Sequence, residues 1–145
     1  MKTRLAALAL LATVALPALA RDTVLHIPLA DVLAMPEAQG KLDPAVKFYL
    51  AGQATPKVER RFSTDVSNPK TNGVGKSDEF GCKWAALGAL INLQNSAKRE
   101  GANAVIDIVS YYKKNEYKSA TDFECHAGAI IIGVALRGTY AKVAE

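Results

Sequence analysis

The sequence predicts an α+β fold: an antiparallel sheet of about four strands with one long helix packed on one face and a single disulfide. Three observations predict it. A capped helical pattern covers residues 78–100, β-type apolar segments lie on both sides of it, and the chain has two cysteines, Cys82 and Cys125. The part of the chain after residue 20 has a length that suits one domain with one core.

The first twenty residues have the layout of a secretory signal peptide. A basic start precedes an apolar run over residues 5–16, and Ala18 and Ala20 supply the small residues of a cleavage site. The run is too short for a bilayer span, which needs about 20 residues. A membrane anchor or an N-terminal core helix is the alternative. We expect cleavage near Ala20 and a single periplasmic or secreted domain over residues 21–145.

Removal of this segment changes the charge of the chain. Lys2 and Arg4 leave with it, so sixteen of the eighteen basic residues remain against fourteen acidic ones. An excess this small does not indicate a nucleic-acid partner, and export makes such a partner less plausible. We therefore expect no nucleic-acid partner and no membrane span in the mature chain.

The helix over residues 78–100 is the clearest element of the sequence. Ser77 is a good N-cap, acidic residues occupy the first turn, and Gly101 is a natural stop. On a helical wheel one apolar stripe faces the core, and Ala86, Leu90, Leu93 and Ala97 widen it on one side. The stripe consists of Phe80, Trp84, Leu87 and Ile91.

Apolar and β-branched segments predict the strands, at residues 24–27, 46–50, 57–63, 103–112 and 123–136. The last two follow each other in the chain, so we expect them to pair antiparallel. Alternation along the last strand places mostly small residues on one face, where the helix can approach closely. That face consists of Cys125, Ala127, Ala129, Ile131, Gly133 and Ala135.

Cys82 and Cys125 are most simply a disulfide, since the chain is expected to be exported. The alternative is a metal site that also uses His26 and His126, because zinc accepts such ligands. However, Cys125 and His126 are neighbours in a predicted strand and point to opposite faces, so one ion could hardly bind both. We expect the disulfide and no metal.

No catalytic residues can be assigned from the sequence. Ser110 and Asp107 lie on opposite faces of their strand, which separates the members of any Ser-His-Asp arrangement with His126. Residues 75–77 read Gly-Lys-Ser, but the earlier glycine of a phosphate-binding loop is missing, because position 70 is lysine. We expect neither an enzyme nor a bound cofactor.

Aromatic and cationic residues are interleaved over residues 111–118, which include the end of the strand 103–112. Such a segment is either a docking surface for a partner or a solvated loop whose tyrosines cover a sheet edge. The candidate partner surface consists of Tyr111, Tyr112, Lys113, Lys114, Tyr117 and Lys118.

The second half of the chain resembles the core of RcsF, an outer-membrane stress-sensing lipoprotein. The likeness rests on Cys82, the helix after it, the Ala-Asn-Ala-Val run at 102–105, and residues 125–136. The resemblance implies a Cys82–Cys125 bridge. It also shows departures: Ile131 stands where the family has a cysteine of a second disulfide, and no lipid-attachment cysteine is present.

Other features are similar to further exported proteins. Residues 101–106 resemble the YbjQ family, labelled as putative heavy-metal-binding, and the whole chain resembles small exported proteobacterial proteins often mislabelled as excinuclease ATPase subunits. We expect a non-enzymatic exported envelope protein that acts as an interaction or sensing module with an envelope protein partner. The alternative is a periplasmic module that binds a metal or a small ligand.

Overall fold

The computed structural model describes residue 12 and residues 21–145, so the expected signal peptide lies outside the described residues apart from one position. The strands are β1 (Asp22–Pro28), β2 (Lys47–Leu50), β3 (Val58–Ser67), β4 (Lys70–Asn72), β5 (Ala104–Tyr112), β6 (Asn115–Tyr117), β7 (Asp122–Gly128), β8 (Ile131–Gly133) and β9 (Leu136–Val143). The helices are α1 (Leu29–Leu33) and α2 (Asp78–Glu100), and a short 3-10 helix covers Pro36–Ala38.

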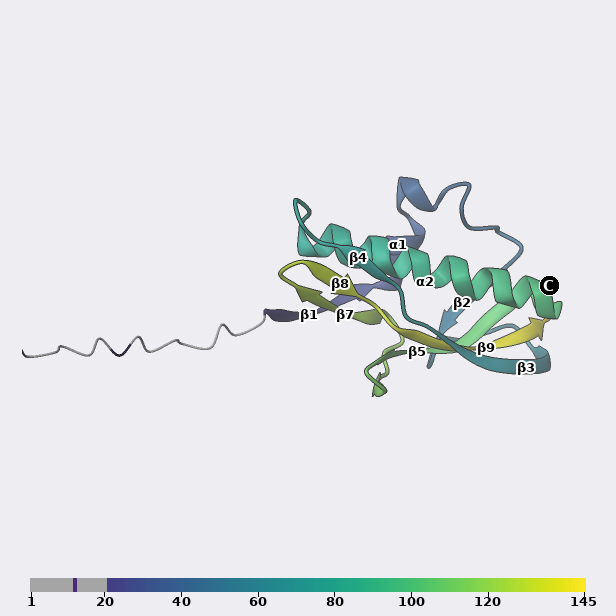
Figure 1. The fold of residues 1–145 in the computed structure, drawn as a ribbon. Helices are drawn as coiled ribbons and strands as arrows, with labels where there is room; N and C mark the ends of the chain where they lie inside the picture. The colour runs from purple at the N-terminus through teal and green to yellow at the C-terminus, as the bar shows by residue number, and fades with distance from the viewer. Residues whose placement is uncertain (1–11, 13–20) are drawn as a thin grey trace, which may run out of the picture.

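These strands form two sheets, one in the order β1-β7-β8-β4 and one in the order β2-β5-β9-β3, with β6 added beside β5. The β2–β5 pair is parallel, and the other pairs are antiparallel. Helix α2 lies along one side of both sheets (Figure 1). The main core lies between α2 and the sheets. The predicted α+β class with one long helix is therefore confirmed, and the strands divide into two sheets.

Helix α2 has the predicted limits. The Ser77 side chain accepts a hydrogen bond from the backbone N–H of Phe80 at 3.1 Å, which caps the first turn. Gly101 ends the helix in the left-handed conformation with φ of 78°. Both ends of the helix could be predicted from the sequence because each depends on one residue type at one position.

The face that α2 buries differs from the predicted stripe. Leu87 is buried, but Phe80 is 38% exposed, and Trp84 and Ile91 are only half-buried. The buried face combines small residues, which allow the sheets to approach closely, with leucines: Cys82, Ala85, Ala86, Ala89, Leu90, Leu93 and Ala97. The predicted burial of Leu87 and of the side that contains Ala86, Leu90, Leu93 and Ala97 is confirmed. The rest of the predicted stripe is only partly buried, so that part of the prediction was wrong.

The Cys82–Cys125 disulfide is present and joins the first turns of α2 to the middle of β7. Its sulfur atoms are 2.07 Å apart, and the two Cα atoms are 5.8 Å apart, within the usual range for a bridge. Both residues are fully buried. The predicted bond between helix and sheet is confirmed.

The predicted long strand over residues 123–136 is wrong. The chain turns back between Gly128 and Ile131, so β7 and β8 form an antiparallel hairpin and β9 begins only at Leu136. The turn also reverses the alternation: Ile132 is buried, whereas Ile131 is 55% exposed. A side chain at Gly128 would lie 2.8 Å from the Ile131 carbonyl oxygen, so the tight turn requires glycine.

The same turn changes the pairing of β5. The sequence predicted that β5 would pair antiparallel with residues 123–136. Instead β5 pairs with β2, β6 and β9, and of the predicted segment only Leu136, the first residue of β9, is its partner. β7 pairs with β1 and β8.

In the part of the chain that the structure describes, no helix has the length and apolar character of a membrane span.

Candidate functional site

Both histidines of the chain contact one carboxylate on the face of β7 opposite the disulfide. Glu124 and His126 are two residues apart in β7, so alternation places them on the same face, and His26 lies directly across from Glu124 in β1. The Nε2 atom of His126 lies 2.8 Å from one Glu124 oxygen, and the Nε2 atom of His26 lies 3.1 Å from the other. The Nδ1 atom of His126 lies 3.2 Å from Asp22.

Two tyrosines of the β5–β6 hairpin cover these histidines. The ring of Tyr112 stacks on His126 with centroids 3.9 Å apart, and the ring of Tyr117 stacks on His26 at 4.2 Å. The Ser110 hydroxyl accepts a hydrogen bond from the backbone N–H of Glu124 at 2.8 Å. The hairpin is therefore held against the outer face of the β1–β7 pair by contacts on both sides of the carboxylate.

The pKa of Glu124 reflects two opposing effects. Burial by itself raises the pKa of this carboxyl, but hydrogen bonds from His126 and His26 outweigh burial and hold the pKa below its ordinary value of 4.5. The Glu124 side chain is only 15% exposed, so solvent screens these contacts weakly. The ionised carboxylate therefore holds this histidine cluster together.

We expect Glu124→Gln to lower the free energy of unfolding by about 1 kcal/mol at neutral pH, because the amide keeps the shape but loses the charge. The folded-state pKa lies below the unfolded value, so the carboxylate stabilises the fold fully above about pH 4.5. That contribution is lost as the pH falls through the folded-state pKa. Thermal melts of both proteins from neutral to acid pH should therefore converge.

The matched control for this experiment is Glu59→Gln, at an exposed position of β3. It should leave the stability unchanged within about 0.5 kcal/mol across the same pH range. A Glu124→Gln difference that stays constant down to the acid limit would contradict the role given to the charged carboxylate.

The residues of the candidate partner surface have different environments. The rings of Tyr112 and Tyr117 stack on the two histidines. The Arg137 guanidinium lies 4.4 Å from the centre of the Tyr111 ring. The lysines of the hairpin, Lys113 and Lys114, are exposed, as is Lys118. The proposed docking role of this surface stays a prediction.

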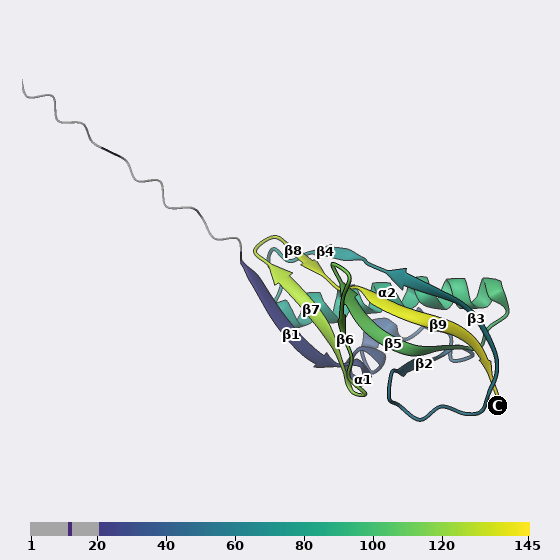
Figure 2. The same ribbon diagram turned by 90° about the horizontal axis from the view of Figure 1, so that it is seen from below.

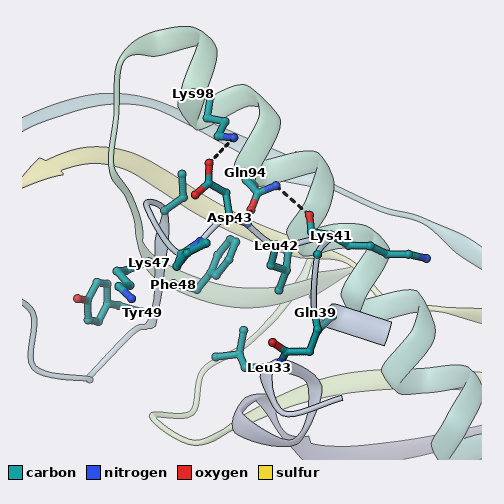
Figure 3. A pocket seen from close by; sticks show the side chains of 14 residues that line it. Leu33, Gln39, Lys41, Leu42, Asp43, Lys47, Phe48, Tyr49, Gln94 and Lys98 are labelled. Atoms are coloured by element: carbon teal, nitrogen blue, oxygen red, sulfur yellow. Dashed lines mark hydrogen bonds and ion pairs between the residues drawn. The ribbon is translucent and has the colours of Figure 1, made fainter. Parts of the chain in front are cut away.

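A pocket of about 790 Å³ lies between α2, β2 and the loop over residues 39–46 (Figure 3). Leu33, Leu42 and Phe48 supply apolar lining, while Lys47 and Gln39 contribute polar groups. A pocket of this size and mixed character is typical of sites for small molecules or for a partner's side chains.

The loop over this pocket is fixed to α2 by Gln94, which is buried. Its amide oxygen accepts a hydrogen bond from the Asp43 N–H at 2.6 Å, and its amide nitrogen donates to the Lys41 carbonyl at 3.2 Å. Lys98 lies 2.6 Å from the Asp43 carboxylate, and its hydrogen bond is the main cause that lowers the pKa of Asp43. Figure 3 marks the Lys98–Asp43 ion pair and the Gln94–Lys41 hydrogen bond with dashed lines. The pocket is thus preformed.

The sequence did not identify either arrangement. The sequence analysis considered His26 and His126 as metal ligands, and His126 also as a member of a catalytic triad, but it did not single out Glu124. The i, i+2 spacing of Glu124 and His126 was the available signal. Gln94, a polar residue between apolar positions of α2, was the signal for the loop contact. Among the described residues, no group of three or more His, Cys, Asp and Glu side chains is arranged to hold a metal ion.

Comparisons with known proteins add no relative: no protein family, no curated protein and no solved structure matches this chain.

Proposed function

We propose that this chain is a non-enzymatic exported protein of the cell envelope that acts as an interaction or sensing module. The observation that carries the proposal is the fully buried Cys82–Cys125 bond, which joins α2 to β7 inside the core. Disulfides persist in oxidising compartments and are rare in the cytosol. A core built around an oxidised pair therefore favours a protein that folds after export.

The pocket beside β2 supports an interaction role. Its loop is already held to α2 by Gln94 and Lys98, so a ligand or partner would find the pocket formed and would lose little free energy in ordering it. The alternative role, binding of a metal or a small ligand, also stays a proposal, and the pocket favours its small-ligand form.

The RcsF-like assignment is likewise a proposal. In the resemblance, a cysteine before the helix is bridged to a cysteine that opens the last strand. The bridge here joins Cys82, which lies within the first turns of α2, to Cys125. Its second cysteine lies in β7, and two further strands, β8 and β9, follow it. The shared bridge supports a related fold, while the absent second disulfide separates this chain from the sensor's own mechanism.

Cell fractionation of a Gram-negative host that expresses the full chain tests the export step. We expect the protein in the periplasmic fraction with Arg21 as its N-terminal residue, because Ala18 and Ala20 fit the cleavage site. The matched control is Leu8→Arg, which interrupts the apolar run and should keep the chain in the cytoplasm. Full-length wild-type protein in the cytoplasm with unbridged cysteines would contradict the proposal.

A further inference from the structure

His126 contacts a carboxylate with each of its two ring nitrogens. Its Nε2 atom lies 2.8 Å from a Glu124 oxygen, and its Nδ1 atom lies 3.2 Å from an Asp22 oxygen at the start of β1. A carboxylate oxygen accepts hydrogen bonds. A neutral imidazole offers one N–H and one lone pair, whereas the protonated imidazolium offers two N–H groups. Both contacts are therefore hydrogen bonds only when His126 is protonated.

His26, the other histidine of the cluster, does not need a second proton in this way. Its ring contacts Glu124 through the Nε2 atom, at 3.1 Å. A single N–H makes that contact in the neutral ring as well as in the charged one. Glu124 stays ionised above about pH 4.5, because burial, which raises its pKa, is outweighed by hydrogen bonds from the two histidines. His126 is thus the group whose proton decides how many hydrogen bonds the cluster makes.

The other charged side chains around the cluster do not pair with Asp22. They are Asp122 on β7, Lys70 on β4, and Lys113, Lys114, Glu116 and Lys118 at the β5–β6 hairpin. Within the described part of the chain these lysines form no ion pair, and Lys70 is separated from His126 in the sheet by β8. Glu116 is paired with Arg137, and Arg21 is paired with Asp78. Asp22 forms its ion pair with His126, so the charge that it meets depends on the proton of that ring.

The β5–β6 hairpin depends on this cluster for its position. Among the described strands β6 pairs with β5 alone, and it lies between β7 and β5 in the view from below (Figure 2). The two residues of its turn, Lys113 and Lys114, are both left-handed, with φ of 51° and 63°, a conformation that favours glycine or asparagine. The turn therefore contributes little to the stability of the hairpin. The stacks of Tyr112 on His126 and of Tyr117 on His26 hold it against the sheet.

We propose that His126 is a pH switch that fixes the β5–β6 hairpin against β1 and β7 when it is protonated and loosens the hairpin when it is neutral. Histidine is the side chain that ordinarily changes its charge between about pH 5 and 8. The neutral ring loses one of its two hydrogen bonds, and it also loses the attraction between a cation and the face of the Tyr112 ring. Lower pH therefore favours the fixed hairpin, as long as Glu124 remains ionised.

The switch controls a surface with a candidate role. The hairpin carries the tyrosines and lysines of the candidate partner surface, so proton uptake by one histidine changes how that surface is presented. The inference rests on the proposed function and deepens it by naming the proton as the signal of the sensing module.

Amide hydrogen exchange measured by NMR tests the proposal. The oxidised chain, purified after export, is compared at about pH 5.5 and about pH 7.5, with rates corrected for the pH dependence of the intrinsic exchange. We expect the hairpin amides to be protected about fivefold more at the lower pH. We also expect them to exchange faster than the amides of α2 at both pH values, because the hairpin opens without unfolding of the core.

Asp22→Asn provides the decisive variant. An asparagine amide can donate or accept a hydrogen bond, so it suits both the neutral and the charged ring of His126. The protection of the hairpin in this variant should change by less than about twofold between the two pH values. The matched control is Asp31→Asn, at an exposed position of α1, which should keep the pH dependence of the wild type.

Several results would overturn the proposal. These are equal protection of the wild-type hairpin at both pH values, greater protection at the higher pH, hairpin amides that exchange only as fast as those of α2, or an unchanged pH dependence in Asp22→Asn. The wild-type comparison needs no variant, so it still decides if Asp22→Asn does not fold. A protein that is exported and oxidised but has a hairpin insensitive to pH refutes the switch and leaves the proposed function standing.

Discussion

Replacing both cysteines, as Cys82→Ser with Cys125→Ser, is expected to lower the free energy of unfolding by about 4 kcal/mol. The bond joins residues separated by 43 positions, and a loop of that length removes much conformational freedom from the unfolded chain. A loss of this size approaches the whole stability of a small domain. We expect the melting temperature to fall by about 10–20 °C, which calorimetry or circular dichroism measures directly.

Reduction of the wild-type protein provides the control for this prediction. With the bond reduced, the wild type should melt close to the double variant, since both then lack the same covalent constraint. Because both cysteines are fully buried, reduction should require denaturant or heating. A reduced wild type that melts within about 2 °C of the oxidised protein would show that noncovalent packing alone holds α2 on β7.

Gly81→Ala is expected to lower the free energy of unfolding by about 2 kcal/mol, although alanine is the better helix former. A Cβ atom at Gly81 would lie 2.3 Å from the Cδ1 atom of Ile132, and Ile132 is fully buried beneath α2. Because Ile132 is fully buried, its side chain, the helix or β8 must shift within the core to make room. Urea unfolding measures the loss.

Ile132→Val provides a sharp control, because valine lacks the Cδ1 atom and leaves the nearest remaining contact at 3.6 Å. By itself it should cost about 1 kcal/mol. Combined with Gly81→Ala it should cost less than the sum of the two single changes, since the clash is removed. Strict additivity would contradict the close contact between α2 and β8.

The elements that the sequence predicted well are those fixed by local chemistry. The limits of α2 follow from Ser77 and Gly101, which act at single positions, and the cysteine pairing follows from an even count in a chain expected to be exported. These features do not depend on which strands meet in the fold. The same local reasoning located β1, β2 and β5 to within a few residues.

The arrangement of the strands in the sheets could not be predicted, because the apolar pattern of the sequence does not reveal the turn between β7 and β8. The segment from Phe123 to Leu136 alternates smoothly enough to suggest one strand, but the tight turn after Gly128 divides it, and a second break separates β8 from β9. Because a turn changes which residues face inward, it also moved Ile131 from the predicted helix face to the surface.

The histidine cluster could not be predicted from residues that are neighbours in the sequence, for a different reason. His26 and Glu124 are 98 positions apart, and they meet because β1 pairs with β7 across nearly the whole chain. The covering tyrosines come from a third segment, the β5–β6 hairpin. Only the i, i+2 spacing within β7 was visible in the sequence.

Intact mass measured on protein extracted from the periplasm, with free thiols alkylated at lysis, tests the bond between α2 and β7 most directly. The account predicts a mass lower than the reduced chain by two hydrogen atoms, no alkylated cysteine, and a single linked peptide pair containing Cys82 and Cys125. Two alkylated cysteines on folded, exported protein would contradict it, because the covalent link between helix and sheet would then be absent.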